Sequence, residues 1–148
     1  MSLRPAAERR ARGRSFEDLA ADLEAAWPAI ARHLEDKPDS AANREALAHC
    51  AGIERWGQSR LRVAFGDPLE MDTYHAYRPP VEQGVAKLTE VMARTRRDTV
   101  ALAHALAEDG IDPKVTVRHN DLGDLSLGGW LVYLRQHASR ELPLRVRR

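Results

Sequence analysis

Apolar residues recur every three or four positions along four stretches of the chain, which is the spacing of one buried helical face. The stretches are residues 15–34, 41–65, 80–110 and 126–142. Residues typical of helix ends stand at two of these boundaries. Ser15 and Asp18 have the spacing of a capping box at the start of the first helix, and Pro143 blocks continuation of the last helix. The pattern predicts an all-α fold, a four-helix bundle.

Two connections between these helices are predicted to be long. The segment LEMDTYHAYRPP, after the second helix, is rich in turn formers and has no helical periodicity. The segment IDPKVTVRHNDLGDLS, after the third helix, contains proline and glycine and only a short β-leaning patch at residues 115–117. We therefore expect irregular crossings after helices two and three.

The 148 residues suffice for one hydrophobic core, so the chain is expected to form one domain with two short ends. Residues 1–14 are predicted to be a basic, flexible N-terminal tail, residues 15–142 the helical domain and residues 143–148 a basic C-terminal tail. Arginines crowd both ends, but the net charge is only +1. Solvated termini account for these arginines, so nucleic acid is not an expected partner.

The composition indicates a soluble protein. Charged residues interrupt every apolar run before it reaches the roughly 20 residues of a membrane span, so no membrane is expected as a partner. The N-terminal sequence lacks the apolar region of a signal peptide, and we expect a cytoplasmic location. The single cysteine, Cys50, lies in an apolar helical stretch and is interpreted as a core residue.

Three residues have the spacing of a metal site. His137 and Glu141 are four positions apart on the last predicted helix, so their side chains project from successive turns of one face. His49, in the apolar stripe of the second helix, is the best candidate for a third ligand. Two imidazoles and one carboxylate leave a coordination position open and can hold zinc, nickel or ferrous iron. This set favours an open metal site of the catalytic type.

The same residues also have simpler interpretations. A histidine and a glutamate four positions apart often form a charge pair on an exposed helix, and a histidine in an apolar stripe is often satisfied by a hydrogen bond. Candidates to line the mouth of the site are His119 and Asn120, before the last helix, and Tyr74 and Tyr77, in the first long connection. Turn stabilisation and packing across the end of the bundle explain these four residues as well.

Two segments resemble the DinB-like superfamily of metal-binding four-helix bundles, namely NREALAHCAGIERWGQSRL and RHNDLGDLSLGGWLVYLRQHASRE. The resemblance covers residues 15–142 and implies a divalent metal ion. It also implies one histidine ligand in the second helix and two ligands in the last, which by position are His49, His137 and Glu141. The common form of the family has a histidine where Glu141 stands. Members similar to mycothiol-dependent isomerases use a carboxylate in the last helix, although it precedes the histidine there.

The resemblance also implies a function and partners. It implies a metal-dependent transferase or hydrolase that acts on a small-molecule substrate, with a low-molecular-weight thiol as one candidate, and it implies a homodimer. The alternative is a non-catalytic, stress-related helical module that binds a small molecule or dimerises without a catalytic metal. Nucleic acid binding through the arginine-rich ends ranks below both hypotheses. The sequence leaves open whether the chain is an enzyme.

Overall fold

The computed structural model describes residues 4–148, and most of them are helical. The α-helices are α1 (Arg4–Ala11), α2 (Phe16–Leu34), α3 (Ala41–Leu61), α4 (Val85–Glu108) and α5 (Leu127–Arg145). The described residues also contain the 3-10 helices η1 (Arg62–Phe65), η2 (Tyr74–Tyr77) and η3 (Val81–Gln83) and the strands β1 (Thr116–His119) and β2 (Gly123–Ser126). The predicted mainly helical class is therefore confirmed.

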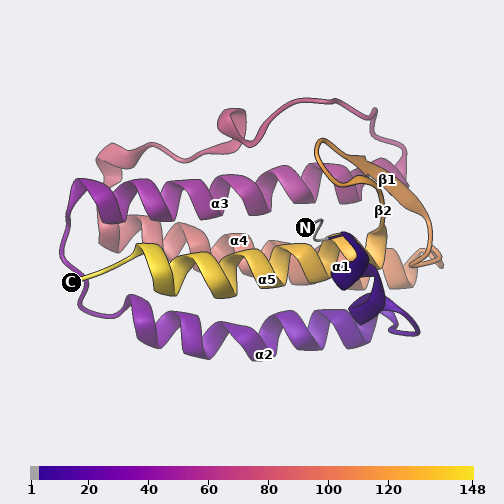
Figure 1. Ribbon diagram of the computed structural model, residues 1–148, viewed down its shortest axis with the longest axis horizontal. Coiled ribbons are helices and arrows are strands. Elements are labelled where there is room, and N and C mark those ends of the chain that lie inside the picture. Colours follow the sequence, from indigo (N-terminus) through magenta and orange to yellow (C-terminus); the bar gives the residue numbers. More distant parts are fainter. Residues whose placement is uncertain (1–3) are drawn as a thin grey trace.

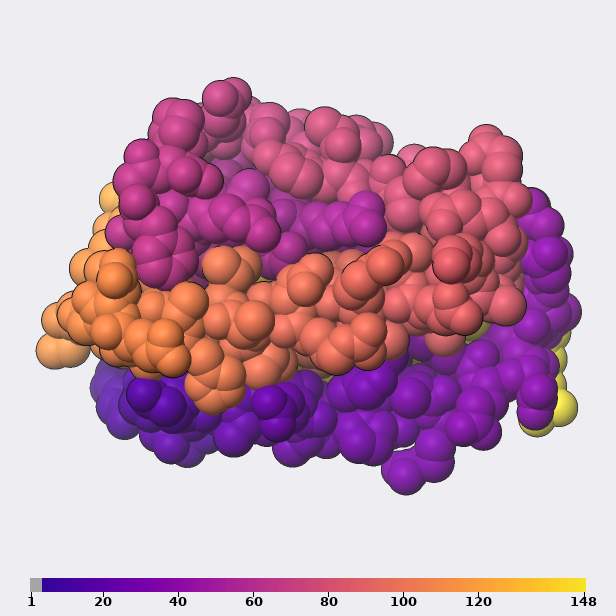
Figure 2. Space-filling model, turned by 180° about the vertical axis from the view of Figure 1, so that it is seen from behind, coloured from indigo at the N-terminus to yellow at the C-terminus, as the bar shows by residue number. Residues whose placement is uncertain are grey.

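The four long helices, α2 to α5, lie alongside one another (Figure 1). Helices α2 and α3 each pack against both α4 and α5. Seen from behind, α4 runs between α2 and the connection that follows α3 (Figure 2). The facing sides bury two apolar clusters, one around Leu23 and Trp130 and the other around Leu88 and Met92. Within residues 4–148, no helix combines the length and the apolar character needed to cross a membrane.

The helix boundaries follow local signals. Ser15 Oγ accepts the N–H of Asp18 at 3.0 Å, and the Asp18 carboxylate accepts the N–H of Ser15 at 3.1 Å, which confirms the predicted capping box. Helix α4 begins later than predicted, at Val85, because Gly84 has a φ of +88° and separates it from η3. Asp39 then accepts the N–H of Val85 at 3.0 Å.

The N-terminal segment differs from the predicted flexible tail. Residues 4–11 form α1, which packs against α5, while residues 1–3 lie outside the described part. Ala7 is fully buried in this contact region. Glu8 adds a polar attachment, because its carboxylate accepts both the N–H and the hydroxyl of Ser126, each at 2.8 Å. A carboxylate is stabilised at the first turn of a helix by the free N–H groups and the helix dipole.

The C-terminal segment also differs from the predicted tail. Helix α5 continues through Pro143 to Arg145, so this proline does not end the helix as predicted, although it removes one backbone donor. Val146 is fully buried. Asn43 binds the next residue, because its Oδ1 accepts the N–H of Arg147 at 2.8 Å and its Nδ2 donates to the Arg147 carbonyl at 2.6 Å. This segment is therefore attached to the first turn of α3.

The connection after α4 contains a hairpin where the sequence pattern predicted only a β-leaning patch. Strands β1 and β2 pair antiparallel, with Thr116 opposite Ser126. The indole N–H of Trp130, in the first turn of α5, donates to the carbonyl of Val117 at 3.0 Å. This bond attaches the hairpin to the helix that follows it.

The connection after α3 crosses the outer side of that helix (Figure 1). Three side chains donate to a single carbonyl in this connection, that of Asp72. They are the indole of Trp56 at 3.2 Å, the guanidinium of Arg60 at 3.2 Å and the amide of Asn120 at 2.9 Å. The connection is thereby fixed to both α3 and the hairpin.

Candidate metal centre

The structure brings His49 of α3 and His137 of α5 together. Their ring centroids lie 5.3 Å apart, with an angle of 45° between the ring planes. The two helices run antiparallel (Figure 1) and approach closely at Gly57, where a Cβ atom would lie 2.5 Å from the side chain of Leu134. The glycine therefore permits the short distance between the helices at which the two rings meet.

His137 is buried and His49 is half-buried, and this burial favours the neutral form of both imidazoles. His137 is 9% exposed, and burial lowers its pKa to about 3, with smaller contributions from His49, Arg140 and Arg145. The pKa of His49 is also lowered, first by burial and then by the positive charge of Arg145. A neutral imidazole keeps a free lone pair, which is the form that binds a metal ion. Both rings are therefore in their ligand form at neutral pH.

Neither ring has a hydrogen-bond partner among the residues that the structure describes. Among residues 4–148, no hydrogen bond involves the imidazole nitrogens of His49 or His137, and both rings contact other rings. Their ring nitrogens are not among the fully buried polar atoms without a partner, so they remain accessible to a ligand from solvent. No hydrogen bond within residues 4–148 therefore supports the interpretation of His49 as a core histidine satisfied in this way.

Glu141, the third predicted ligand, lies one turn beyond His137. Its side chain is 25% exposed, and one oxygen is 3.6 Å from the guanidinium of Arg140. Its negative charge acts on His49, where it raises the pKa against the effect of burial. In the conformation observed, no three His, Cys, Asp or Glu side chains within residues 4–148 are arranged to hold a metal ion. The structure thus brings two of the predicted ligands together and leaves the carboxylate beside them.

The donor set is chemically suited to a divalent transition metal. Imidazole nitrogens and a carboxylate oxygen are ligands that zinc, nickel and ferrous iron accept. The donors stand on two packed helices, and His137 and Glu141 share one face of α5. Binding of all three would require the Glu141 carboxylate to move from its present position beside Arg140, and an ion pair that is partly exposed opposes such a movement only weakly.

Aromatic rings surround the two imidazoles. Tyr74 of η2 contacts His49 edge to face, with centroids 4.8 Å apart, and His75 stacks on Tyr74 at 4.2 Å. Tyr133 lies 6.1 Å from His137. Tyr74 was among the predicted lining residues, whereas sequence reasoning missed His75 and Tyr133. The position of Tyr133, one turn before His137 on the same helix face, is the signal that could have identified it.

The segment that carries Tyr74 lies close against α3. A Cβ atom at Gly52 would be 2.8 Å from Cγ of Arg78 and 3.3 Å from the Tyr74 carbonyl oxygen. Arg78 also pairs with Glu45, one turn before His49. The glycine and the ion pair together hold the Tyr74 ring over His49.

His119 does not line the imidazole pair, and its contacts agree with the alternative interpretation, stabilisation of a turn. It is 3% exposed, and its ring centroid is 4.9 to 5.0 Å from those of Trp56, Trp130 and Tyr133. Its Nδ1 accepts two backbone N–H groups of the following turn, at 3.0 and 3.2 Å, so Nε2 carries the hydrogen of the neutral ring. Burial lowers its pKa to about 4. His119 therefore stabilises the hairpin turn and fills an aromatic cluster.

Asn120 and Tyr77 surround a buried arginine instead of the imidazole pair. Arg60 is 1% exposed, and it donates to Oδ1 of Asn120 at 2.7 Å. It also lies 3.6 Å from the carboxylate of Asp72, which accepts the hydroxyl of Tyr77 at 2.7 Å. The guanidinium stacks over Trp56, 4.7 Å from a ring centroid. These two predicted lining residues therefore hold the connection after α3 in place.

Cys50 is adjacent to His49 in the sequence but does not supply a nucleophile. The side chain is 1% exposed, and burial raises the pKa of the thiol to about 12. Because the reactive form of cysteine is the thiolate, this thiol is inert at neutral pH. The interpretation of Cys50 as a core residue is confirmed.

Comparisons with known proteins give no assignment. No protein-family model matches this chain, and no curated protein or solved structure matches it either.

Proposed function

We propose that the protein is a metal-dependent enzyme of the DinB-like kind, with a divalent metal ion held by His49, His137 and Glu141. The supporting observation is the contact between two neutral imidazoles from separate helices, His137 buried and His49 half-buried, which have no hydrogen-bond partner within residues 4–148. In this proposal, α2 to α5 form the four-helix bundle of that superfamily, and the long connections after α3 and α4 cover one side of it.

A metal ion at this position would act as a Lewis acid that makes a bound thiol or water acidic enough to ionise near neutral pH. The protein's own residues have separate roles in this proposal. His49 and His137 supply neutral donors from rigid helices, and Tyr74 excludes water from the outer side of His49. Arg145 places a positive charge near both imidazoles, which favours an anionic group on the substrate.

The proposal includes a reaction type, a substrate class, a location and an oligomeric state. We propose transferase or hydrolase chemistry on a small-molecule substrate, with a low-molecular-weight thiol as the nucleophile of a transfer reaction. A cytoplasmic location and a homodimeric state are proposed with it. Light scattering of the purified protein tests the homodimer, which predicts twice the chain mass of 16.6 kDa.

Metal binding is the first test of the proposal. Protein purified without an affinity tag should retain, after incubation with zinc and removal of excess ion, about one ion per chain by elemental analysis. The variants His49→Ala and His137→Ala should each lose this ion. His104→Ala is the matched control, because His104 is an exposed histidine on α4 and should leave the stoichiometry unchanged.

Two outcomes would reject the metal centre. One is wild-type protein that retains no zinc, nickel or iron after loading with each, and the other is stoichiometric metal in both site variants. Circular dichroism of each variant establishes that a loss of metal does not come from unfolding. Cobalt loading adds a spectroscopic readout, because the visible absorption of Co²⁺ reports its nitrogen and oxygen ligands independently of any reaction.

A further inference from the structure

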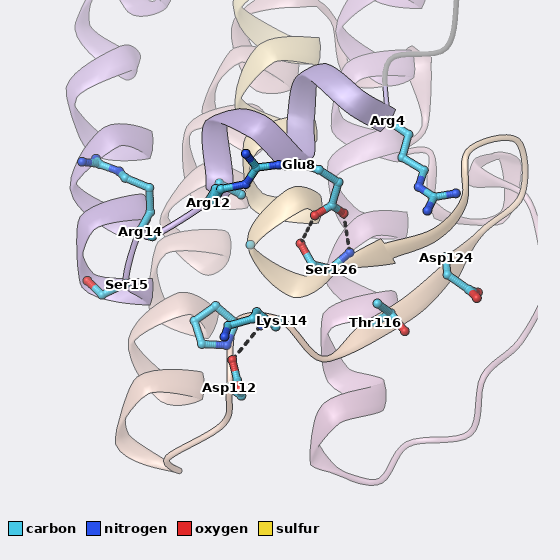
Figure 3. A pocket seen from close by; sticks show the side chains of 14 residues that line it. Arg4, Glu8, Arg12, Arg14, Ser15, Asp112, Lys114, Thr116, Asp124 and Ser126 are labelled. Carbon is cyan, nitrogen blue, oxygen red and sulfur yellow. Dashed lines mark hydrogen bonds between the residues drawn. The ribbon is translucent and has the colours of Figure 1, made fainter.

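A cavity of about 680 Å³ opens where α1, the start of α2, the hairpin and the start of α5 meet (Figure 3). A volume of this size is in the usual range for small-molecule sites. Its lining includes side chains from segments far apart in the sequence, such as Arg12 and Arg14 after α1 and Lys114 before β1. Ala11, Pro113 and Gly128 contribute a small-residue wall. The fold therefore gathers basic groups around a concave surface.

The acidic groups of the cavity have partners of their own. Glu8 accepts two hydrogen bonds from Ser126, at 2.8 Å each, as Figure 3 shows. Asp124 lies 3.5 Å from Arg118, a residue outside the cavity lining. Asp112 accepts the backbone N–H of Lys114 at 2.9 Å rather than its ammonium group. The carboxylates therefore do not neutralise all of the basic side chains.

Two of the basic side chains that line the cavity have no ion-pair or hydrogen-bond partner in the described part of the chain. Arg14 is paired with Asp22 at 2.6 Å. By contrast, no ion pair or hydrogen bond within residues 4–148 involves the side chain of Arg12 or of Lys114. Both are exposed at the cavity. They come from different segments, so their presence in one cavity is a product of the fold and not of local sequence.

The positive charges on and after α1 repel one another, which disfavours the folded arrangement of this segment. Five arginines lie within residues 4–14, and Glu8 is the one acidic residue among them. Like charges at such spacing repel one another, and the repulsion is relieved when an anion binds. Despite this cost, the segment is ordered as α1 and a tight turn at Gly13, with a φ of +73°. An anionic ligand is the chemical class that this arrangement stabilises.

We propose that this cavity binds a small organic phosphate, with the phosphate group between Arg12 and Lys114 and the organic part against Ala11, Pro113 and Gly128. A phosphate monoester carries close to two negative charges at neutral pH, which matches two cations without partners. Hydroxyl groups of Ser15 and Thr116 also line the cavity.

The proposed site is separate from the candidate metal centre. The cavity lies at the end of the molecule where α2 begins, and α3 begins at the opposite end, next to the end of α2 (Figure 1). His49 lies in the first half of α3. The inference therefore does not rest on metal binding, and failure of one proposal leaves the other testable.

Phenyl phosphate is a suitable probe, because it combines the anionic group with a compact apolar body. Titration followed by amide NMR should give saturable shifts concentrated in residues 11–15, 112–116 and 126–128. Arg12→Ala and Lys114→Ala should each weaken binding by roughly tenfold, the usual effect of removing a charge-assisted hydrogen bond. Phenol, which lacks the anion, should not bind, and inorganic phosphate should bind more weakly than phenyl phosphate.

Arg10→Ala is the matched control. Arg10 lies on α1, is exposed and does not line the cavity, so this variant makes the same change in net charge and should bind within about twofold of wild type. Equal weakening by Arg10→Ala would mean a diffuse basic surface that attracts any polyanion, and would overturn the proposal. Absence of saturable binding at millimolar phenyl phosphate would overturn it as well.

Discussion

Gly57 of α3 lies against Leu134 of α5 so closely that a Cβ atom at position 57 would be 2.5 Å from Cδ2 and 2.7 Å from Cδ1 of the leucine. We expect Gly57→Ala to destabilise the protein by about 1 to 3 kcal/mol, since overpacking forces the two helices apart. Urea unfolding measures this change. The double variant Gly57→Ala with Leu134→Ala should be less destabilised than the sum of the single variants. Additive effects would mean that the two side chains do not compete for space.

The carboxylate of Glu141 is predicted to strengthen metal binding without being essential to it. Because the two histidines already face each other and Glu141 stands beside them, Glu141→Gln should weaken zinc affinity by roughly tenfold or more, about 1.4 kcal/mol or more. Competition with a chromogenic chelator measures the affinity. Glu90→Gln, an exposed change on α4, provides the control. Unchanged affinity in Glu141→Gln would remove this residue from the ligand set.

Glu8 is predicted to hold α1 on the rest of the protein. Loss of its charged hydrogen bonds to Ser126 in Glu8→Gln should cost about 1 to 3 kcal/mol of local stability. Hydrogen exchange should then accelerate in residues 4–14, whereas Glu108→Gln, an exposed change at the end of α4, should have no such effect. Slow exchange of this segment in Glu8→Gln would show that α1 is held by its apolar contacts alone.

His119 is predicted to make stability depend on pH. Burial lowers its pKa to about 4 in the folded state, below the value of 6.5 for a free histidine, so the unfolded chain binds more protons between these values. Stability should therefore be complete above pH 6.5 and should fall as the pH drops toward 4, by at most about 1.4 kcal/mol per pH unit from this group. Urea unfolding at several pH values measures the slope.

The variant His119→Gln separates this effect from other titrating groups. Its amide oxygen can accept the backbone N–H groups that Nδ1 accepts in the wild type, but it does not titrate. Burial also lowers the pKa of His137, so part of the pH dependence should persist. A slope identical to that of wild type would mean that His119 charges as easily in the folded protein as in the unfolded chain.

Local sequence rules were sufficient for the features that depend on local structure. Ser15 and Asp18 lie three residues apart, and their capping box needs no other part of the chain. Apolar periodicity likewise locates the long helices, and it brought His49 to attention because a histidine interrupts the stripe of α3. His49 was placed beside His137 as the third ligand that a metal needs from a neighbouring helix, and the resemblance to the DinB-like superfamily implies the same residues.

Features that depend on tertiary contacts were not predictable in the same way. Helix α1 has no apolar stripe, and it is ordered through one distant hydrogen-bonded pair, Glu8 with Ser126, and through small buried side chains such as Ala7. The backbone of Arg147 is similarly bound by Asn43, which is distant in the sequence. The sequence left both the mouth of the site and stabilisation of a turn open for His119, because its proximity to α5 along the chain gives no information on which side of the helix it occupies.

Two tryptophans lie close together in the core, and their fluorescence should report on this region. Two of the three in the sequence, Trp56 and Trp130, have ring centroids 5.3 Å apart and both contact His119, whereas Trp27 packs near the second apolar cluster. Ultraviolet emission from the pair should respond when the hairpin detaches or when the neighbouring imidazole takes up a proton. The molecule thus contains an intrinsic optical reporter of one end of its core, and fluorescence can follow opening of that end before the helices separate.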